Sequence, residues 1–455
     1  MAGLARARGL APLRHQRFRL LVSGQLTSNV GDAFYAVALP WYVLATHGGP
    51  LLLGTVLAAY GIPRTALLLA GGHLSDRWRP WTIMMATDSV RALAVGALAV
   101  AAALGPPRAL VLVPIAVVLG AGAGLFLPGS FAIVPELLPG DDLQAGNALM
   151  SGGTQLATLV GPAIGGALVA LIGPASAFGV DAASFAVSAL TLAGLRAASA
   201  RAGAETARGS AGSSAAGSAE PPAEAEDPVA DGPTVRSLLR TERILQLGLL
   251  VTVAANLGSG GMDEVALPSL AHGPLHSGAV GYGILIGAFG AGALAGTLTA
   301  AQARQARRPF LVGSLAFLAE AVFIAVAPYL GSTPAVAGAI LGLGIMNGFG
   351  NVLTITAFQR WAPPQLLGRL SGLLMLSSLG VFPVSVLLAA VFVRHLGPAS
   401  FFVFAAATLT IAILAGLSQR TWRDFGIEAA VRADRPDPIL SAGTPAIADP
   451  TGGPS

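Results

Sequence analysis

Long runs of apolar residues alternate with short polar or charged stretches along most of the chain. About 20 apolar residues in a helix, which rises about 1.5 Å per residue, cross the hydrocarbon core of a bilayer. Each run is long enough for this, so we predict an all-α membrane protein with about twelve transmembrane helices. The expected spans are 20–45, 51–74, 81–104, 109–135, 143–172, 175–196, 244–271, 278–302, 309–330, 334–360, 367–394 and 398–417.

Composition supports this prediction and narrows the chemistry. The chain is 54% hydrophobic and only 11% charged, whereas a soluble chain carries about 25% charged residues. The absence of cysteine excludes disulfides, thiolate metal sites and cysteine nucleophiles. The histidines show no metal-ligand spacing, and no phosphate-binding loop or zinc-protease motif is present. We therefore expect a protein that is not an enzyme and holds neither a metal nor a cofactor.

The arginines lie mostly on one side of the expected spans. Among the 26 basic residues, only Arg108 and Arg394 lie in loops on the opposite side, and Arg64 and Arg91 lie inside spans. Because basic loops remain in the cytoplasm, we predict a multi-pass protein of the plasma membrane with both termini cytoplasmic. This placement favours an anchoring role for the arginines and no nucleic-acid partner. The segment Met1–Arg19 is interpreted as a cytoplasmic cap and not a signal peptide.

Two stretches have too little apolar surface to fold. One is the Ala-, Gly-, Ser-, Pro- and Glu-rich middle loop, and the other is the Pro-rich tail. They divide the chain into four expected parts. These are an N-terminal six-helix bundle over 1–197, a flexible cytoplasmic linker over 198–240, a C-terminal six-helix bundle over 241–420 and a disordered cytoplasmic tail over 421–455.

Motifs of the first half return in the second half. The sequence Asn-Val-Gly-Asp at 29–32 precedes Val-Ala-Leu-Pro at 37–40, and Asn-Leu-Gly-Ser at 256–259 precedes Val-Ala-Leu-Pro at 265–268. Pro139 and Pro363 also correspond, each followed four positions later by leucine. We therefore predict a duplicated bundle whose halves have the same orientation, because six spans is an even number.

A short charged turn, Gly71–Pro80, separates the second and third runs. Its spacing resembles the loop between helices 2 and 3 of the major facilitator superfamily. The resemblance implies a gating loop in which Gly72, Asp76, Arg77 and Arg79 latch the two halves. The alternative is a basic membrane anchor that contains an aspartate by chance.

Further motifs extend the resemblance over nearly the whole chain. Within the superfamily it is most similar to bacterial exporters of the enterobactin-exporter and macrolide-efflux type. The matching residues are Leu13-Arg14, Phe18-Arg19, Gly31-Asp32, Asp76-Arg77, Asp88, Arg91-Ala92, Asn147-Ala148-Leu149, Gly161-Pro162, Gly165-Gly166, Asp181 and Ser184-Phe185. The resemblance implies two pseudo-symmetric bundles around a central cavity.

Asp32 is the strongest candidate for a proton-coupling residue. It lies about 12 residues into its span, ~18 Å deep, where a lone charge costs at least ~2.5 kcal/mol. Arg64 lies at a similar depth in the next span, so the two could pair. A static ion pair that only fixes helix packing is the alternative.

Other intramembrane charges are weaker candidates. Asp88 and Arg91 are one helical turn apart, so we expect a local pair, although Arg91 remains a possible partner for coupling. Asp181, Asp263 and Glu264 are expected toward the outer face, where they line a vestibule or are solvated near a helix end. Glu320 has no obvious partner, and no role is assigned to it.

The segment with Gly161, Pro162, Gly165 and Gly166 removes one backbone donor and clears side chains from one helix face. The resemblance implies that it seals the cavity against leakage between the halves. Ordinary packing of small residues is the alternative.

These features predict a secondary transporter that exports a small amphiphilic molecule, such as a drug-like metabolite, a macrolide or a siderophore. Without an ATP-binding motif its energy must come from a gradient, and protons suit a chain with one midplane acid. We expect a monomer in the lipid bilayer. A proton-coupled importer of a nutrient and a non-transporting sensor or scaffold remain alternatives. A scaffold predicts a tightly packed centre, whereas a transporter needs a cavity lined from both halves.

Overall fold

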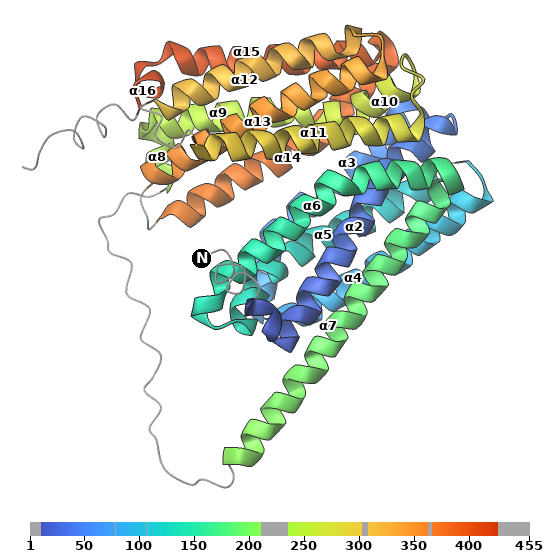
Figure 1. The fold of residues 1–455 in the computed structure, drawn as a ribbon, viewed down its shortest axis with the longest axis vertical. Helices are drawn as coiled ribbons and strands as arrows, with labels where there is room; N and C mark the ends of the chain where they lie inside the picture. Colours follow the sequence, from blue (N-terminus) through green and yellow to red (C-terminus); the bar gives the residue numbers. More distant parts are fainter. Residues whose placement is uncertain are drawn as a thin grey trace, which may run out of the picture.

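The computed structural model describes residues 11–77, 79–106, 108–210, 235–302, 308–362 and 366–425. In these ranges the chain is helical and forms no strand (Figure 1). The long helices of the first half are α2 (Gln16–Ala45), α3 (Gly49–Arg77), α4 (Pro80–Leu104), α5 (Ala109–Leu137), α6 (Gly140–Ile172) and α7 (Pro174–Ser210).

The second half repeats this pattern. Its long helices are α9 (Arg243–Gly261), which continues through η2 (Met262–Ala266) and α10 (Leu267–His272), then α11 (Gly278–Gln302), α12 (Pro309–Val326), α13 (Thr333–Trp361), α14 (Leu367–Leu396) and α15 (Pro398–Ser418). Four shorter elements accompany them, η1 (Ala11–Arg14), α8 (Val235–Thr241), η3 (Ala327–Tyr329) and α16 (Arg420–Arg423).

Eleven helical stretches of the described chain are long and apolar enough to cross a membrane. Each corresponds to one of the expected spans 51–74 to 398–417. The first expected span, 20–45, is the 30-residue helix α2, which is as long as the others but is not among the eleven. Polar residues such as Gln25, Asn29 and Asp32 interrupt its apolar character. α2 nevertheless packs in the middle of its bundle against α6 and α7.

The helices form two bundles, α2–α7 and α9–α15, which lie side by side in Figure 1. Two helix pairs make most of the contact between the bundles, α3 with α14 and α6 with α11. The prediction of two pseudo-symmetric six-helix bundles is therefore confirmed.

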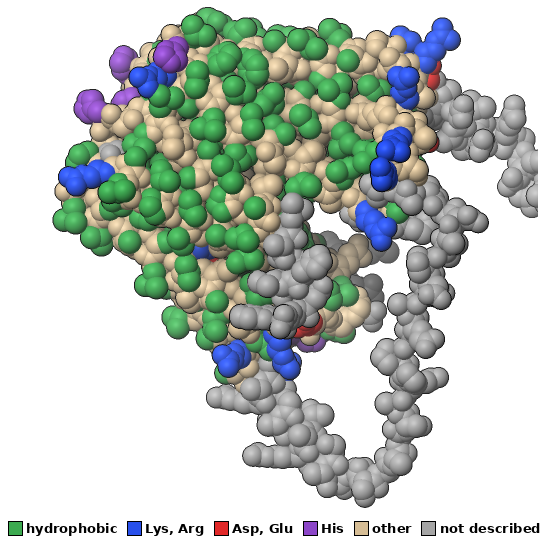
Figure 2. All heavy atoms as spheres, turned by 180° about the vertical axis from the view of Figure 1, so that it is seen from behind, with side chains coloured by type: hydrophobic (Ala, Val, Ile, Leu, Met, Phe, Trp, Pro, Cys, Tyr) green, Lys and Arg blue, Asp and Glu red, His purple; other side chains and the backbone are tan. Residues whose placement is uncertain are grey.

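The surface of the bundles suits a lipid environment. Many large apolar side chains point outward, for example Leu110, which is 88% exposed, and Leu171, which is 82% exposed. In Figure 2 hydrophobic side chains cover the middle of the molecule and charged side chains gather at its ends. Such a surface is stable in lipid, since lipid tails are as apolar as leucine.

The gating turn is shorter than the sequence indicated. Gly71–Arg77 continues α3 as a helix, and α4 begins at Pro80. Proline is well suited to the first helical position because its missing N–H group needs no partner there. The expected ten-residue turn is thus the last two turns of α3 and a short connection.

The two halves also share their helix junctions. Gly173 and Gly397 each end a helix with a positive φ, 84° and 82°, which glycine adopts without strain. A proline follows each of them and starts the next helix, at Pro174 and Pro398. The two junctions therefore turn the chain in the same way in each bundle.

The repeat is offset by one extra residue in the second half. Gly258 follows Gly31 by 227 positions, whereas Pro268 follows Pro40 by 228 positions. The extra residue falls at η2, which is a π-helix in the middle of an otherwise α-helical span. A π-helical turn accommodates an inserted residue inside an α-helix, often at a functional site.

The expected linker over 198–240 is helical at both ends. α7 continues to Ser210, and α8 covers Val235–Thr241. Residues 211–234 and the tail from 426 onward lie outside the described residues.

Candidate functional site

Three cavities lie along the middle of the molecule, and we name each by its position. The interface cavity, about 410 Å³, is lined by α2 and α6 of the first bundle and by η2, α10 and α11 of the second. The Arg91 cavity, about 290 Å³, lies mainly in the first bundle. The Glu320 cavity, about 620 Å³, is lined by the second bundle together with Trp422 of α16. A tightly packed centre, which a scaffold predicts, is therefore absent from the described chain.

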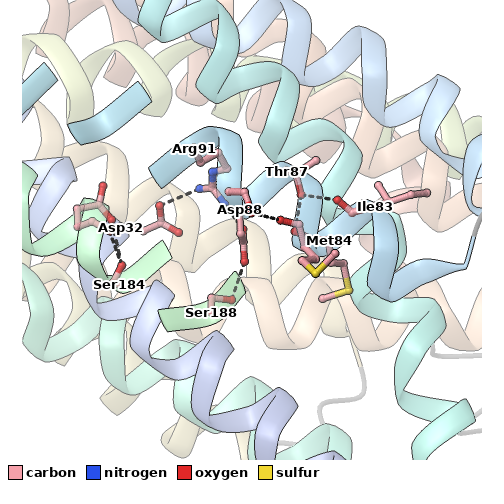
Figure 3. A network of polar contacts seen from close by, with 11 residues as sticks. Asp32, Ile83, Met84, Thr87, Asp88, Arg91, Ser184 and Ser188 are labelled. Atoms are coloured by element: carbon pink, nitrogen blue, oxygen red, sulfur yellow. Dashed lines mark hydrogen bonds and ion pairs between the residues drawn. The ribbon is translucent and has the colours of Figure 1, made fainter. Parts of the chain in front are cut away.

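Arg91 is the centre of the polar cluster in the first bundle (Figure 3). Its Nη2 donates to Oδ1 of Asp32 at 3.0 Å, and its Nη1 lies 3.6 Å from Oδ1 of Asp88. The guanidinium carbon lies 3.8 Å from the centre of the Phe185 ring. The two ends of the guanidinium thus face two carboxylates, an arrangement that suits its planar fork.

The two carboxylates have different surroundings. The Asp32 side chain is 45% exposed and lines both the interface cavity and the Arg91 cavity. The Asp88 side chain is fully buried, and its Oδ2 accepts a hydrogen bond of 2.6 Å from the Ser188 hydroxyl. Its Oδ1 has no hydrogen-bond partner among the described residues. Asp32 is therefore the accessible member of the cluster and Asp88 the enclosed one.

Asp32 does not pair with Arg64 in this structure. Arg91 is the partner of Asp32, and no described carboxylate lies within ion-pair distance of Arg64. The reason is that α3 packs on α5 and α14 and makes little contact with α2. Similar depth on consecutive spans does not make two residues neighbours. The Arg64 guanidinium instead lies 5.7 Å from the centre of the Tyr60 ring.

Arg64 nevertheless belongs to the same cavity. Asp32, Arg64, Arg91, Asp181 and Glu264 all line the Arg91 cavity. Five of the charged residues singled out in the sequence therefore come together, and Glu264 brings the second bundle into the cluster.

Asp181, Asp263 and Glu264 do not form a separate outer vestibule. Asp181 is buried, and its Oδ1 lies within 3.4 Å of the Ser184 hydroxyl. Asp263 lines the interface and Glu320 cavities, and Glu264 lines the interface and Arg91 cavities. The π-helix η2 carries both Asp263 and Glu264, and the two adjacent acids share only the interface cavity.

The glycine segment of α6 contacts both bundles. A β-carbon added at Gly161 would lie 2.4 Å from the β-carbon of Ala33 on α2. One added at Gly166 would lie 2.6 Å from the carbonyl oxygen of Ala279 on α11, and one at Gly283 would lie 2.6 Å from that of Pro162. Gly165 in turn packs on the backbone of Phe34. The absence of side chains thus allows α6 to approach α11 across the bundle interface.

The predicted gating residues are described only in part. The side chains of Asp76 and Arg77, and the surroundings of Gly72, lie outside the described residues. The Arg79 guanidinium lies 5.0 Å from the centre of the Trp81 ring. The corresponding segment of the second half is inside α11, where Gly296 packs against the carbonyl oxygen of Ile345.

Several cavity residues were not predicted from the sequence. They are Asn29, Tyr60, Thr154, Tyr282, Asn347 and Asn351. A polar residue inside an apolar run is the signal that could have found the asparagines, since such residues are rare in spans and usually face the interior.

Comparisons with known proteins agree with this architecture. A family model described as "Transmembrane secretion effector" matches residues 7–209. The enterobactin exporter EntS of Citrobacter koseri is 26% identical over 372 residues, which cover 79% of this chain and 81% of that protein. The multidrug efflux pump Tap of Mycolicibacterium fortuitum is 30% identical over 183 residues, 39% of this chain. That match spans only 44% of Tap.

Solved structures show the same fold. The nucleoside transporter NupG superposes with a TM-score of 0.65 at 11% identity, covering 89% of this chain and 99% of that one. A bacterial homologue of the iron transporter ferroportin, in its inward-facing state, gives 0.62 at 14% identity, covering 89% and 98%. Together, the fold, the family model over residues 7–209 and the exporter relatives support a membrane transporter that resembles the exporters of the major facilitator superfamily.

Proposed function

We propose that the chain exports a small amphiphilic molecule across the plasma membrane in exchange for protons. The interface cavity is the observation that carries this proposal, because both bundles line it and a charged residue of each, Asp32 and Glu264, faces it. A site shared by two bundles changes its access when one bundle rocks against the other. The exporter relatives EntS and Tap support export over import.

The contacts between the bundles support an inward-facing state. They include Gly54 with Ala390, Gly61 with Phe382, Gly166 with Ala279, and the Trp41 and His272 rings at 5.3 Å. All of these lie toward the end of the molecule opposite residue 11 and α8. With the termini in the cytoplasm, as the arginine distribution indicates, the outer end is closed.

Arg91 couples a proton to this movement in our proposal. When Asp32 is ionised, its carboxylate holds Arg91. A proton on Asp32 removes that attraction, and Arg91 then moves toward Asp88, whose Oδ1 has no hydrogen-bond partner in the described chain. A proton drives the cycle only if its affinity for Asp32 differs between the inward-open and outward-open states. The movement of Arg91 supplies such a difference.

The gating loop belongs to the same cycle. Asp76 and Arg79 flank the short connection between α3 and α4, at the end where the bundles must approach each other to close the cytoplasmic side. We propose that Asp76 latches that closed state, as the resemblance implies. The glycine segment of α6 correspondingly seals the outer end in the inward-facing state.

An accumulation screen tests the transport function. Cells that lack the gene would receive the wild-type chain or the Asp32→Asn variant, and would be loaded with dyes, macrolides and siderophores in turn. We expect lower accumulation of at least one compound with the wild-type chain than with the variant at equal membrane abundance. Equal accumulation for every compound would contradict export.

A further inference from the structure

The Glu320 cavity is the largest of the three and takes no part in the proposed proton step. Its lining residues come from the second bundle and from α16, away from the Arg91 cluster of the first bundle. Small-molecule sites in proteins are clefts of about 300–1,000 Å³ that combine apolar walls with a few polar groups. At about 620 Å³, this cavity has the size of such a site.

Glu320 is held in one orientation by two asparagines. The Asn351 side-chain amide donates to Oδ1 of Asn347 at 3.1 Å, and the Asn347 amide donates to Oε1 of Glu320 at 3.1 Å. Glu320 is only 6% exposed, and its Oε2 has no hydrogen-bond partner in the described part of the chain. These two hydrogen bonds thus fix Oε1 of Glu320 and leave its Oε2 without a hydrogen-bond donor beside the cavity.

Asp263 adds a second acid to the lining. It lies on η2, between the interface cavity and the Glu320 cavity, and it lines both. Among the described residues that line the Glu320 cavity, none is arginine, lysine or histidine. Charges inside a membrane are costly unless they are paired. The two acids therefore favour a positively charged occupant.

Aromatic side chains make up much of the apolar wall. Phe289, Phe310, Phe317, Phe358 and Trp422 all line the cavity. An aromatic face attracts a cation electrostatically, in addition to burying apolar area. Aromatic walls around two acids suit an organic cation better than a small hydrated ion. The described residues also contain no group of three acids or histidines that could hold a metal ion.

We propose that the Glu320 cavity binds amphiphilic organic monocations, with Glu320 as the main counter-charge and Asp263 on the path from the interface cavity. This inference rests on the proposed transport function and narrows its substrate to amphiphiles that carry positive charge. An anionic substrate such as a catecholate would meet two acids and, among the described lining residues, no base in this cavity.

A pair of probes with the same shape and opposite charge tests the inference. Tetraphenylphosphonium is a permanent cation, and tetraphenylborate is its anionic counterpart. Binding of each to the full-length protein in nanodiscs would be measured by isothermal titration calorimetry. We expect tetraphenylphosphonium to bind at least tenfold more tightly than tetraphenylborate. Equal affinities would overturn the proposal.

The variants assign the binding to this cavity. Glu320→Gln keeps an acceptor for Asn347 and removes the charge, and we expect it to weaken tetraphenylphosphonium binding at least tenfold. Glu136→Gln, which changes an exposed acid at the end of α5, is the matched control and should bind as the wild type does. Unchanged binding in Glu320→Gln would overturn the assignment.

A second variant decides the question if Glu320→Gln does not fold. Asp263→Asn should weaken tetraphenylphosphonium binding at least threefold, and it should strengthen tetraphenylborate binding by at least the same factor. An unchanged affinity for tetraphenylphosphonium would overturn the site. Binding is measured without a gradient, so its outcome is independent of transport. Cation binding without transport would contradict the proposed function alone, whereas transport of anions with no cation binding would contradict this inference alone.

Discussion

Arg91 contacts two carboxylates through two different nitrogens, and the coupling role that we propose for it depends on that geometry. Lysine has a single charged nitrogen on a flexible stem and cannot reproduce the fork. Loss of the cation altogether would leave Asp88 buried without a counter-charge, which costs about 3–5 kcal/mol. Substitutions of Arg91 that keep or remove the positive charge therefore separate a loss of coupling from a loss of folding.

We expect Arg91→Lys to keep membrane abundance within about twofold of wild type and to lower gradient-driven transport at least tenfold. Arg91→Gln should lower abundance as well, because it strands the buried Asp88. Immunoblots of membranes and transport assays at matched abundance would measure the two effects. Normal transport in Arg91→Lys would show that the shared ion pair is not needed.

At the scale of elements, α6 and α11 approach closely because glycines leave room between them. Leucine at Gly166 would meet the backbone of Ala279, and overpacking of this kind costs about 1–3 kcal/mol. We expect Gly166→Leu to lower the melting temperature of the purified protein and to reduce transport. Gly152→Leu is a matched control on the same helix, since an added β-carbon there meets nothing within 4 Å. Similar melting temperatures for both variants would argue against a tight contact between the bundles at Gly166.

The short connection after α3 gives a second prediction at this scale. If Asp76 latches the inner end, its contacts must form and break during the cycle. Asp76→Asn should then cut transport at least tenfold and leave membrane abundance near normal. A fall in abundance that accounts for the lost transport would indicate a structural role in place of a gating one.

The helices themselves follow from the sequence because a span must satisfy its backbone internally and be long enough to cross the bilayer. The neighbours of each helix do not follow from it. Asp32 pairs with Arg91 of α4 although α3 comes next in the chain, because α3 packs against α5 and α14. The π-helix at Met262–Ala266 was also unforeseen, although the change in repeat offset from 227 to 228 positions contains its signal.

For the whole molecule, the arginine distribution predicts which end lies in the cytoplasm. The chain has no cysteine, so single cysteines report directly on exposure. Thr241→Cys, at the end of α8, should resist an impermeant thiol reagent in intact cells, whereas His395→Cys, at the opposite end, should react. Both positions are exposed. Labelling of Thr241→Cys from outside would reverse the predicted orientation.

The central claim is that a proton on Asp32 drives uphill export. Purified wild-type and Asp32→Asn proteins would be reconstituted into liposomes, and transport of a substrate found in the accumulation screen would be followed with and without a pH gradient. Because asparagine resembles the protonated acid permanently, we expect the variant to lose gradient-driven accumulation and to retain downhill exchange. Gradient-driven accumulation at the wild-type rate in Asp32→Asn would contradict the account.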